Sequence, residues 1–206
     1  MAEPEPAPEP SPAPSARIPL TQRSWPFWFA PAVMALVGWI GSVHQPGPLS
    51  VYPETRALPL AWYIVEQALA VLLTLAALAA GAAIVGGRLL PYRLALQTVC
   101  DARFLLALAA AFVSNSVVHA FVPGKIVEWG GPHGITVNLA PLEIVWVVVL
   151  VLAATSLLLR VALGYFRLLS TTIPRPLPCL GALMISLVLG EFTAQMLSQL
   201  LLRLIP

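Results

Sequence analysis

The amino-acid sequence predicts an all-α polytopic membrane protein with five transmembrane helices, and three observations support this class. Apolar residues make up 59% of the chain and charged residues only 10%, whereas a soluble domain carries about 25% charged residues. Five continuous apolar runs each approach the roughly 20 residues that a helix needs to cross the hydrocarbon core. Most basic residues fall in alternate gaps between these runs, and this bias predicts a fixed orientation in the membrane.

The five predicted spans cover residues 27–43, 62–85, 104–122, 139–159 and 180–202. The runs are rich in Ala and Leu and lack the alternation of polar and apolar residues that is typical of membrane β-barrel strands. A helix closes its backbone hydrogen bonds within one span, so helices are favoured. The first run starts late, and no small-residue cleavage pattern follows it, so we interpret it as a retained span and not as a signal peptide.

The distribution of basic residues predicts a cytoplasmic N-terminus and an external C-terminus. In this orientation the inside segments hold eight basic residues and the outside segments hold three, as the positive-inside rule requires. The inside residues are Arg17, Arg23, Arg88, Arg93, Arg103, Arg160, Arg167 and Arg175, and the outside residues are Arg56, Lys125 and Arg203. The Ala, Leu, Arg and Pro bias is typical of a GC-rich bacterial gene. The expected location is therefore a bacterial inner membrane.

The chain divides into a tail and a membrane domain. Residues 1–24 are rich in alternating proline, which favours extended polyproline II conformation and disorder. This tail is either a solvated leader or a docking ligand for a partner. Residues 25–206 form the five-helix domain, in which the second span contains the small-residue stretch AALAAGAA at 76–83. Small residues let helices approach closely in lipid, so this helix is expected to be central in the bundle or to face a partner.

The connection before the third span, residues 86–103, mixes leucines with Arg88, Arg93 and Arg103. It is consistent with a short amphipathic helix on the inner leaflet or with an ordinary basic loop. Cys100 and Cys179 lie near the same ends of their spans, without a CxxC or metal spacing. We interpret them as small apolar residues on the cytoplasmic side, where thiols stay reduced.

Ionisable residues within the apolar runs are the candidate site. Glu66, Glu143 and Glu191 fall inside predicted spans, where charged groups are costly and usually face the bundle interior. In the predicted orientation all three lie in the outer half of the membrane. Glu191, Gln195 and Ser198 share a helix face at i, i+4 and i+7. The full predicted cluster is Glu66, Gln67, Asn115, His119, Glu143, Glu191, Gln195 and Ser198.

Three interpretations of this cluster remain open. The polar groups can be structural, joining helices by hydrogen bonds worth about 0.6–2 kcal/mol each. They can form an outward-facing site for a small molecule, a lipid headgroup or a proton, because a carboxyl group can take up and release a proton. A metal site from His119, Glu66 and Glu143 is the third, although ligands at fixed local spacing are absent from the sequence. Glu143 follows Pro141 at a helix start, where the helix dipole favours a carboxylate.

The sequence carries no motif for a named chemistry. There is no HExxH, GxSxG, P-loop or glycine-rich dinucleotide loop, so we expect no cofactor and no catalytic residues. The net charge of +2 and the lack of a basic stripe argue against nucleic-acid binding. The expected partners are the lipid bilayer and other membrane proteins.

The architecture resembles the Yip1-like five-span membrane protein family. The resemblance is based on the five spans, the N-terminal tail, the basic Gly86-Gly87-Arg88 connection and the Trp146-containing fourth span. Neither the DLxGP-like nor the GYG-like sequence of eukaryotic members occurs in the chain, and Gly164-Tyr165-Phe166 matches the second only in part. The resemblance implies a non-enzymatic protein that organises membranes or binds partners, and it supplies no catalytic residues.

Together these observations predict a non-enzymatic integral membrane protein that acts as a partner-binding, assembly or membrane-organising subunit. The first alternative is a small transporter or proton-coupled component that uses Glu66, Glu143 and Glu191. The second alternative is a membrane enzyme that acts on lipid or quinone near the outer leaflet.

Overall fold

The computed structural model of the 206-residue chain describes residues 29–53, 58–87, 89–114 and 140–203. The predicted N-terminal tail, Asn115, His119 and the predicted outer loop 122–138 lie outside the described residues. The described helices are α1 (Phe29–Gly41), α2 (Leu60–Gly86), α3 (Tyr92–Val113), α5 (Pro141–Ser170) and α6 (Pro176–Leu202). Two two-residue strands, β1 (Val43–His44) and β2 (Tyr52–Pro53), pair antiparallel between α1 and α2.

Four of these helices, α2, α3, α5 and α6, are apolar and long enough to cross a membrane. By length and composition they make the chain an all-helical, multi-pass membrane protein. The described part of the first predicted span, α1, has 13 residues, or about 20 Å at 1.5 Å per residue. That length is shorter than the hydrocarbon core of about 30 Å.

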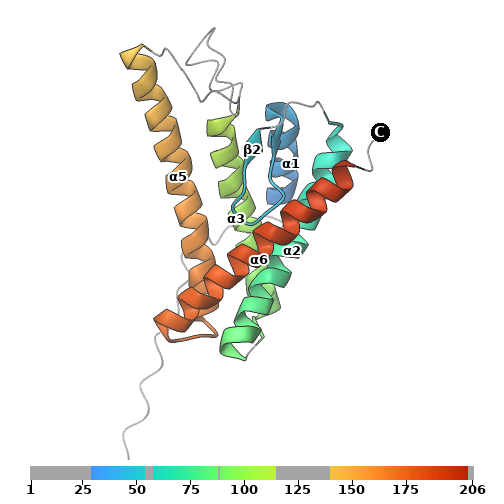
Figure 1. The fold of residues 1–206 in the computed structure, drawn as a ribbon, viewed down its shortest axis with the longest axis vertical. Helices are drawn as coiled ribbons and strands as arrows, with labels where there is room; N and C mark the ends of the chain where they lie inside the picture. Colours follow the sequence, from blue (N-terminus) through green and yellow to red (C-terminus); the bar gives the residue numbers. More distant parts are fainter. Residues whose placement is uncertain (1–28, 54–57, 88, 115–139, 204–206) are drawn as a thin grey trace, which may run out of the picture.

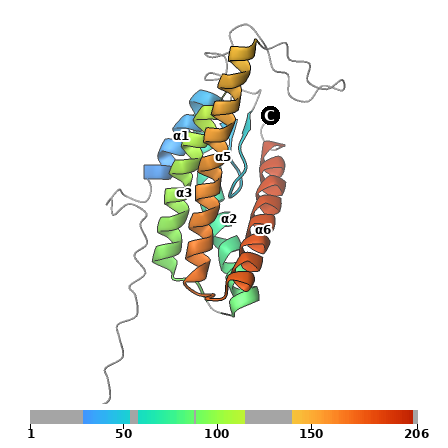
Figure 2. The ribbon, with the colours of Figure 1, turned by 90° about the vertical axis from the view of Figure 1, so that its left-hand side faces the viewer.

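The helices pack in two groups with the strand pair between them. α3 packs along α5 and α1, and α2 packs chiefly along α6, while α1 also contacts α2. Figure 2 shows α1, α3 and α5 on one side and α6 on the other, with the β1–β2 hairpin in between. α5 and α6 meet at their connected ends and diverge toward the other end of the bundle (Figure 1).

Small residues bring α2 and α6 close together. A Cβ atom added to Gly81 would collide with the Ser186 hydroxyl and would lie 2.6 Å from the Ala182 carbonyl oxygen. A Cβ atom on Gly190 would lie 3.3 Å from the Ala77 Cβ. The small-residue stretch of α2 therefore packs against α6 of the same chain, as expected for helices that associate in lipid through close backbone approach.

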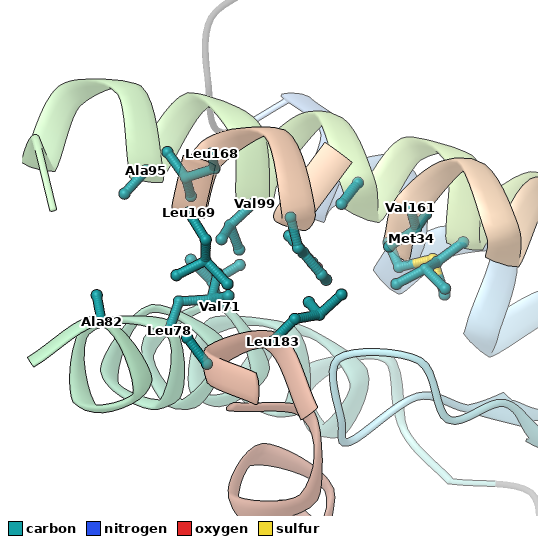
Figure 3. Close-up of a cluster of buried hydrophobic side chains, with 14 of the residues drawn as sticks. Met34, Val71, Leu78, Ala82, Ala95, Val99, Val161, Leu168, Leu169 and Leu183 are labelled. Carbon is teal, nitrogen blue, oxygen red and sulfur yellow. The ribbon is translucent and has the colours of Figure 1, made fainter. Parts of the chain in front are cut away.

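The apolar core lies between α2, α3, α5 and α6 and extends to α1 and the hairpin. Leu78 and Ala82 of α2, Val99 of α3, Leu169 of α5 and Leu183 of α6 all belong to it, and Figure 3 shows these side chains converging between the helices. The core holds the helix ends in place. Toward the opposite end, the core continues to Met34 of α1 and Val43 of the hairpin, beside which the polar side chains of the hairpin lie.

The third helix differs from the sequence prediction. We expected a span beginning at residue 104 after a surface connection, but α3 begins at Tyr92 and includes Arg103. Residues 86–103 are therefore neither a helix on the leaflet surface nor a basic loop. Gly87, with φ of 62°, ends α2 and donates its N–H to the Ala83 carbonyl, and Pro91 then precedes α3. Removing Arg103 from the inside count leaves seven basic residues against three outside.

Two other helices extend beyond their predicted ends. α5 continues to Ser170, although the predicted span ends at residue 159, and α6 begins at Pro176, four residues before the predicted start. Arg160 and Arg167 of α5 are exposed. A 30-residue helix is about 45 Å long at 1.5 Å per residue, so α5 is longer than the hydrocarbon core of about 30 Å.

Candidate functional site

The connection between α1 and α2 folds into the bundle as a hairpin, which we define as residues 43–53. Ser42, with φ of 48°, turns the chain sharply after α1, and the Val43 carbonyl lies so near Gly38 that a Cβ atom there would be 2.8 Å from it. β1 and β2 then pair with Val43 opposite Pro53 and His44 opposite Tyr52. The hairpin enters between the helices and reaches toward the middle of the bundle (Figures 1 and 2).

Irregular backbone at membrane depth is tolerated only where the protein or water satisfies its hydrogen bonds. The tip sequence Gln45-Pro46-Gly47-Pro48-Leu49 meets this requirement. Gln45 donates its N–H to Glu66 Oε1 at 2.8 Å, Gly47 donates to the Ser50 hydroxyl at 2.9 Å, and Leu49 donates to Glu191 Oε1 at 2.6 Å. Pro46 and Pro48 have no N–H. Every donor of the tip backbone is therefore either paired or absent.

Glu66 of α2 fixes the first strand of the hairpin. Its second oxygen, Oε2, lies 2.7 Å from His44 Nδ1, and both side chains are buried. The Tyr63 ring, one turn earlier on α2, stacks on the His44 imidazole with ring centroids 5.2 Å apart. One carboxyl group thus holds both a backbone amide and an imidazole.

Arg103 of α3 holds the same turn from the opposite side. Its side chain is completely buried, and its guanidinium donates to the Gln45 carbonyl at 3.2 Å and to the Thr74 hydroxyl at 3.1 Å. Gln45 in return donates its side-chain amide to the Leu106 carbonyl of α3 at 3.0 Å. The positive charge of Arg103 also interacts with Glu66 and Glu191, so a cation faces two acids around one loop.

Glu191 of α6 closes the site at the tip of the hairpin. Besides accepting the Leu49 N–H, its Oε2 lies so close to Gly47 that any Cβ atom there would collide with it. Gly190 is equally constrained, because a Cβ atom on it would lie 2.7 Å from the Pro48 ring. α6 therefore presents a glycine and a glutamate together to the hairpin, the first for close approach and the second as a hydrogen-bond acceptor.

A small pocket leads to Glu66 from between α2 and α6. Its volume is about 20 Å³, which is close to the minimum that one water molecule needs. Glu66, Pro46 and Ser198 border it together with apolar side chains. These apolar residues are Trp62, Val65, Leu69, Leu73, Ala194, Leu197 and Leu201.

The structure brings some of the sequence-predicted residues together and separates others. Glu66 and Glu191 bind the same hairpin, and Ser198 borders the pocket beside Glu66. Gln67 is buried next to Glu66, whereas Gln195 is exposed.

Glu143 serves a different purpose from Glu66 and Glu191. Its Oε2 accepts the Ala140 N–H at 2.7 Å, which stabilises the start of α5 as a capping interaction. This end of α5 lies away from the hairpin (Figure 1). Within the described ranges, no group of three or more His, Cys, Asp or Glu residues is arranged to hold a metal ion.

Sequence reasoning missed His44, Gln45 and Arg103. The predicted topology places the segment between the first two spans outside the membrane and Arg103 among the inside residues. The signals that would have found them are local. The hairpin segment 43–53 carries no charged side chain other than His44 and contains the Pro-Gly-Pro turn, and Arg103 lies between apolar residues at helical spacing. Comparisons with protein-family models, with curated proteins and with solved structures find no match to this chain.

Proposed function

We propose that this chain is a membrane protein whose activity is coupled to proton transfer, and that Glu66 takes up and releases the proton. The observation that carries the proposal is the 2.7 Å contact between Glu66 Oε2 and His44 Nδ1 on a hairpin inside a helical bundle. Ionisable side chains at membrane depth mark ion and proton pathways, and irregular backbone at that depth is used by transporters and channels to form their sites.

The buried Arg103 and the pocket beside Glu66 support the same proposal. Arg103 is buried without a carboxylate in direct salt-bridge contact among the described residues. A proton bound by Glu66 itself makes its carboxyl group a weaker acceptor for the Gln45 amide. The pocket between α2 and α6 gives a water molecule a route to Glu66.

The orientation of the bundle is part of the proposal. We propose a cytoplasmic N-terminus, an external C-terminus and a bacterial inner membrane, supported by the basic residues near the α2–α3 and α5–α6 turns. A cysteine replacing the exposed Leu89 is then expected to react with a membrane-impermeant maleimide only after the membrane has been permeabilised. A cysteine replacing the exposed Arg203 is expected to react in intact cells, and the reverse pattern would invert the orientation.

The test of the function is proton flux in reconstituted liposomes. Wild-type protein is expected to acidify or alkalinise the lumen under an imposed potential, as a trapped pH-sensitive dye reports. The Glu66→Gln variant keeps an oxygen for the Gln45 amide but cannot ionise, so its flux is expected to fall to that of protein-free liposomes. The matched control is Glu143→Gln, which alters a carboxyl group at a helix start and is expected to leave the flux unchanged.

A partner-binding or membrane-organising role is the second candidate, and the exposure of α5 favours it. Only 11% of its most apolar 18-residue window is buried, and its first half leans away from α6 (Figure 1). This surface is available to a membrane partner, and the resemblance to Yip1-like proteins implies the same role. Absence of flux in both wild type and Glu66→Gln would remove the proton role and leave this candidate. No observation favours the membrane-enzyme alternative.

A further inference from the structure

Four buried polar atoms around the hairpin make no hydrogen bond within the described part of the chain. They are Gln45 Oε1, Arg103 Nε, the Tyr165 hydroxyl and Glu191 Oε2. The side chains of Gln45, Arg103 and Tyr165 are completely buried. Unpaired polar atoms are costly in a protein interior, and a water molecule that bridges them is the usual way in which such groups are satisfied.

These atoms belong to one neighbourhood. Arg103 donates directly to the Gln45 carbonyl, and Glu191 contacts the hairpin two to four residues farther along, at Gly47 and Leu49. Tyr165, on α5, interacts electrostatically with both Arg103 and Glu191. The set therefore spans α3, α5, α6 and the hairpin.

The chemistry of the four atoms selects the ligand. Arg103 Nε–H is a donor, Gln45 Oε1 and Glu191 Oε2 are acceptors, and the tyrosine hydroxyl is both. A metal cation would meet the guanidinium charge, and an anion would meet the Glu191 carboxylate. Water donates two hydrogen bonds and accepts two, so it complements a mixed set of this kind.

We propose that Gln45, Arg103, Tyr165 and Glu191 bind internal water that links α3, α5 and α6 through the hairpin. This hydration site is distinct from the pocket beside Glu66, which Trp62 and Ser198 border.

Difference infrared spectroscopy in lipid nanodiscs tests the hydration site without any flux measurement. Wild type is expected to show water O–H stretching bands that shift when H₂¹⁶O is replaced by H₂¹⁸O. Tyr165→Phe removes one partner and keeps the ring, so one of these bands is expected to move or disappear. The matched control is Tyr92→Phe at the exposed start of α3, which is expected to leave the bands unchanged.

A structure at a resolution that shows ordered water gives the second readout. Density within hydrogen-bonding distance of Arg103 Nε is expected in wild type. A dry site in which Nε contacts Glu191 directly, or isotope-sensitive bands identical in wild type and Tyr165→Phe, would overturn the proposal. A proton-flux measurement distinguishes the hydration site from the proton-coupled function. If bound water is present and wild type carries no flux, the hydration site stands and the proton-coupled function fails.

Discussion

Replacing Arg103 with leucine is expected to lower the free energy of unfolding by about 1–3 kcal/mol, the cost of leaving buried hydrogen-bonding groups without their partner. Leucine removes the donors to the Gln45 carbonyl and the Thr74 hydroxyl. It also removes the positive charge that interacts with Glu66 and Glu191. Glu66 of α2 and Glu191 of α6 then remain beside the hairpin without this cation nearby. Thermal unfolding in detergent measures the change.

The control for this substitution is on the same helix. Arg93 is exposed near the start of α3, so Arg93→Leu removes the same charge from a solvated position and is expected to leave the unfolding temperature nearly unchanged. Arg103→Lys keeps the charge but lacks the forked geometry that reaches two acceptors at once, and it is expected to fall between wild type and Arg103→Leu. Equal stability of Arg103→Leu and Arg93→Leu would show that Arg103 does not hold the hairpin.

The second large effect is expected at Gly190, where a single methyl group is enough to disturb the site. In Gly190→Ala the new Cβ would lie 2.7 Å from the Pro48 ring and 3.3 Å from the Ala77 Cβ, so either the hairpin or α2 must move. Overpacking of this kind costs about 1–3 kcal/mol. It also shifts Glu191, the next residue, away from the Leu49 amide.

Gly181 provides the matched comparison, because it lies in the same helix with no atom within 4 Å of its added Cβ. Gly181→Ala is expected to be neutral or to stabilise the protein by up to about 1 kcal/mol, since alanine is the better helix former. Thermal unfolding of both variants in one detergent measures the difference. A Gly190→Ala protein as stable as Gly181→Ala would mean that the hairpin does not press on α6.

Hydropathy predicted the bounds of α2 closely and misplaced the start of α3 and the end of α5. The second span was predicted at residues 62–85 and is found at Leu60–Gly86, because its apolar run is continuous. The start of α3 was missed because Arg93, Asp101 and Arg103 interrupt the apolar pattern. α3 is also the helix with the largest buried share of its apolar window, 56%. A helix enclosed by protein can carry charges that a lipid-facing helix cannot.

The candidate site was predictable only in part for a similar reason. Glu66 and Glu191 stand out in the sequence because a carboxyl group in an apolar run is costly. Their partners are the backbone amides of Gln45 and Leu49, and no pattern of side chains reveals a backbone partner 21 or 142 residues away. The prediction that the acids, His119 and Asn115 lie in the outer half of the membrane was based on depth alone, and depth does not give the rotation of a helix.

The hydrogen bonding of the hairpin tip has a consequence for how the chain is made. The amide of Leu49 leaves the ribosome long before Glu191, the residue that accepts its hydrogen bond at 2.6 Å, and the Gln45 carbonyl precedes Arg103 by 58 residues. Until α6 is made, the Leu49 N–H lacks the acceptor that it has in the folded chain, although Gln45 and Gly47 already have theirs on Glu66 and Ser50. The hairpin tip therefore completes its hydrogen bonds only after the final helix is synthesised.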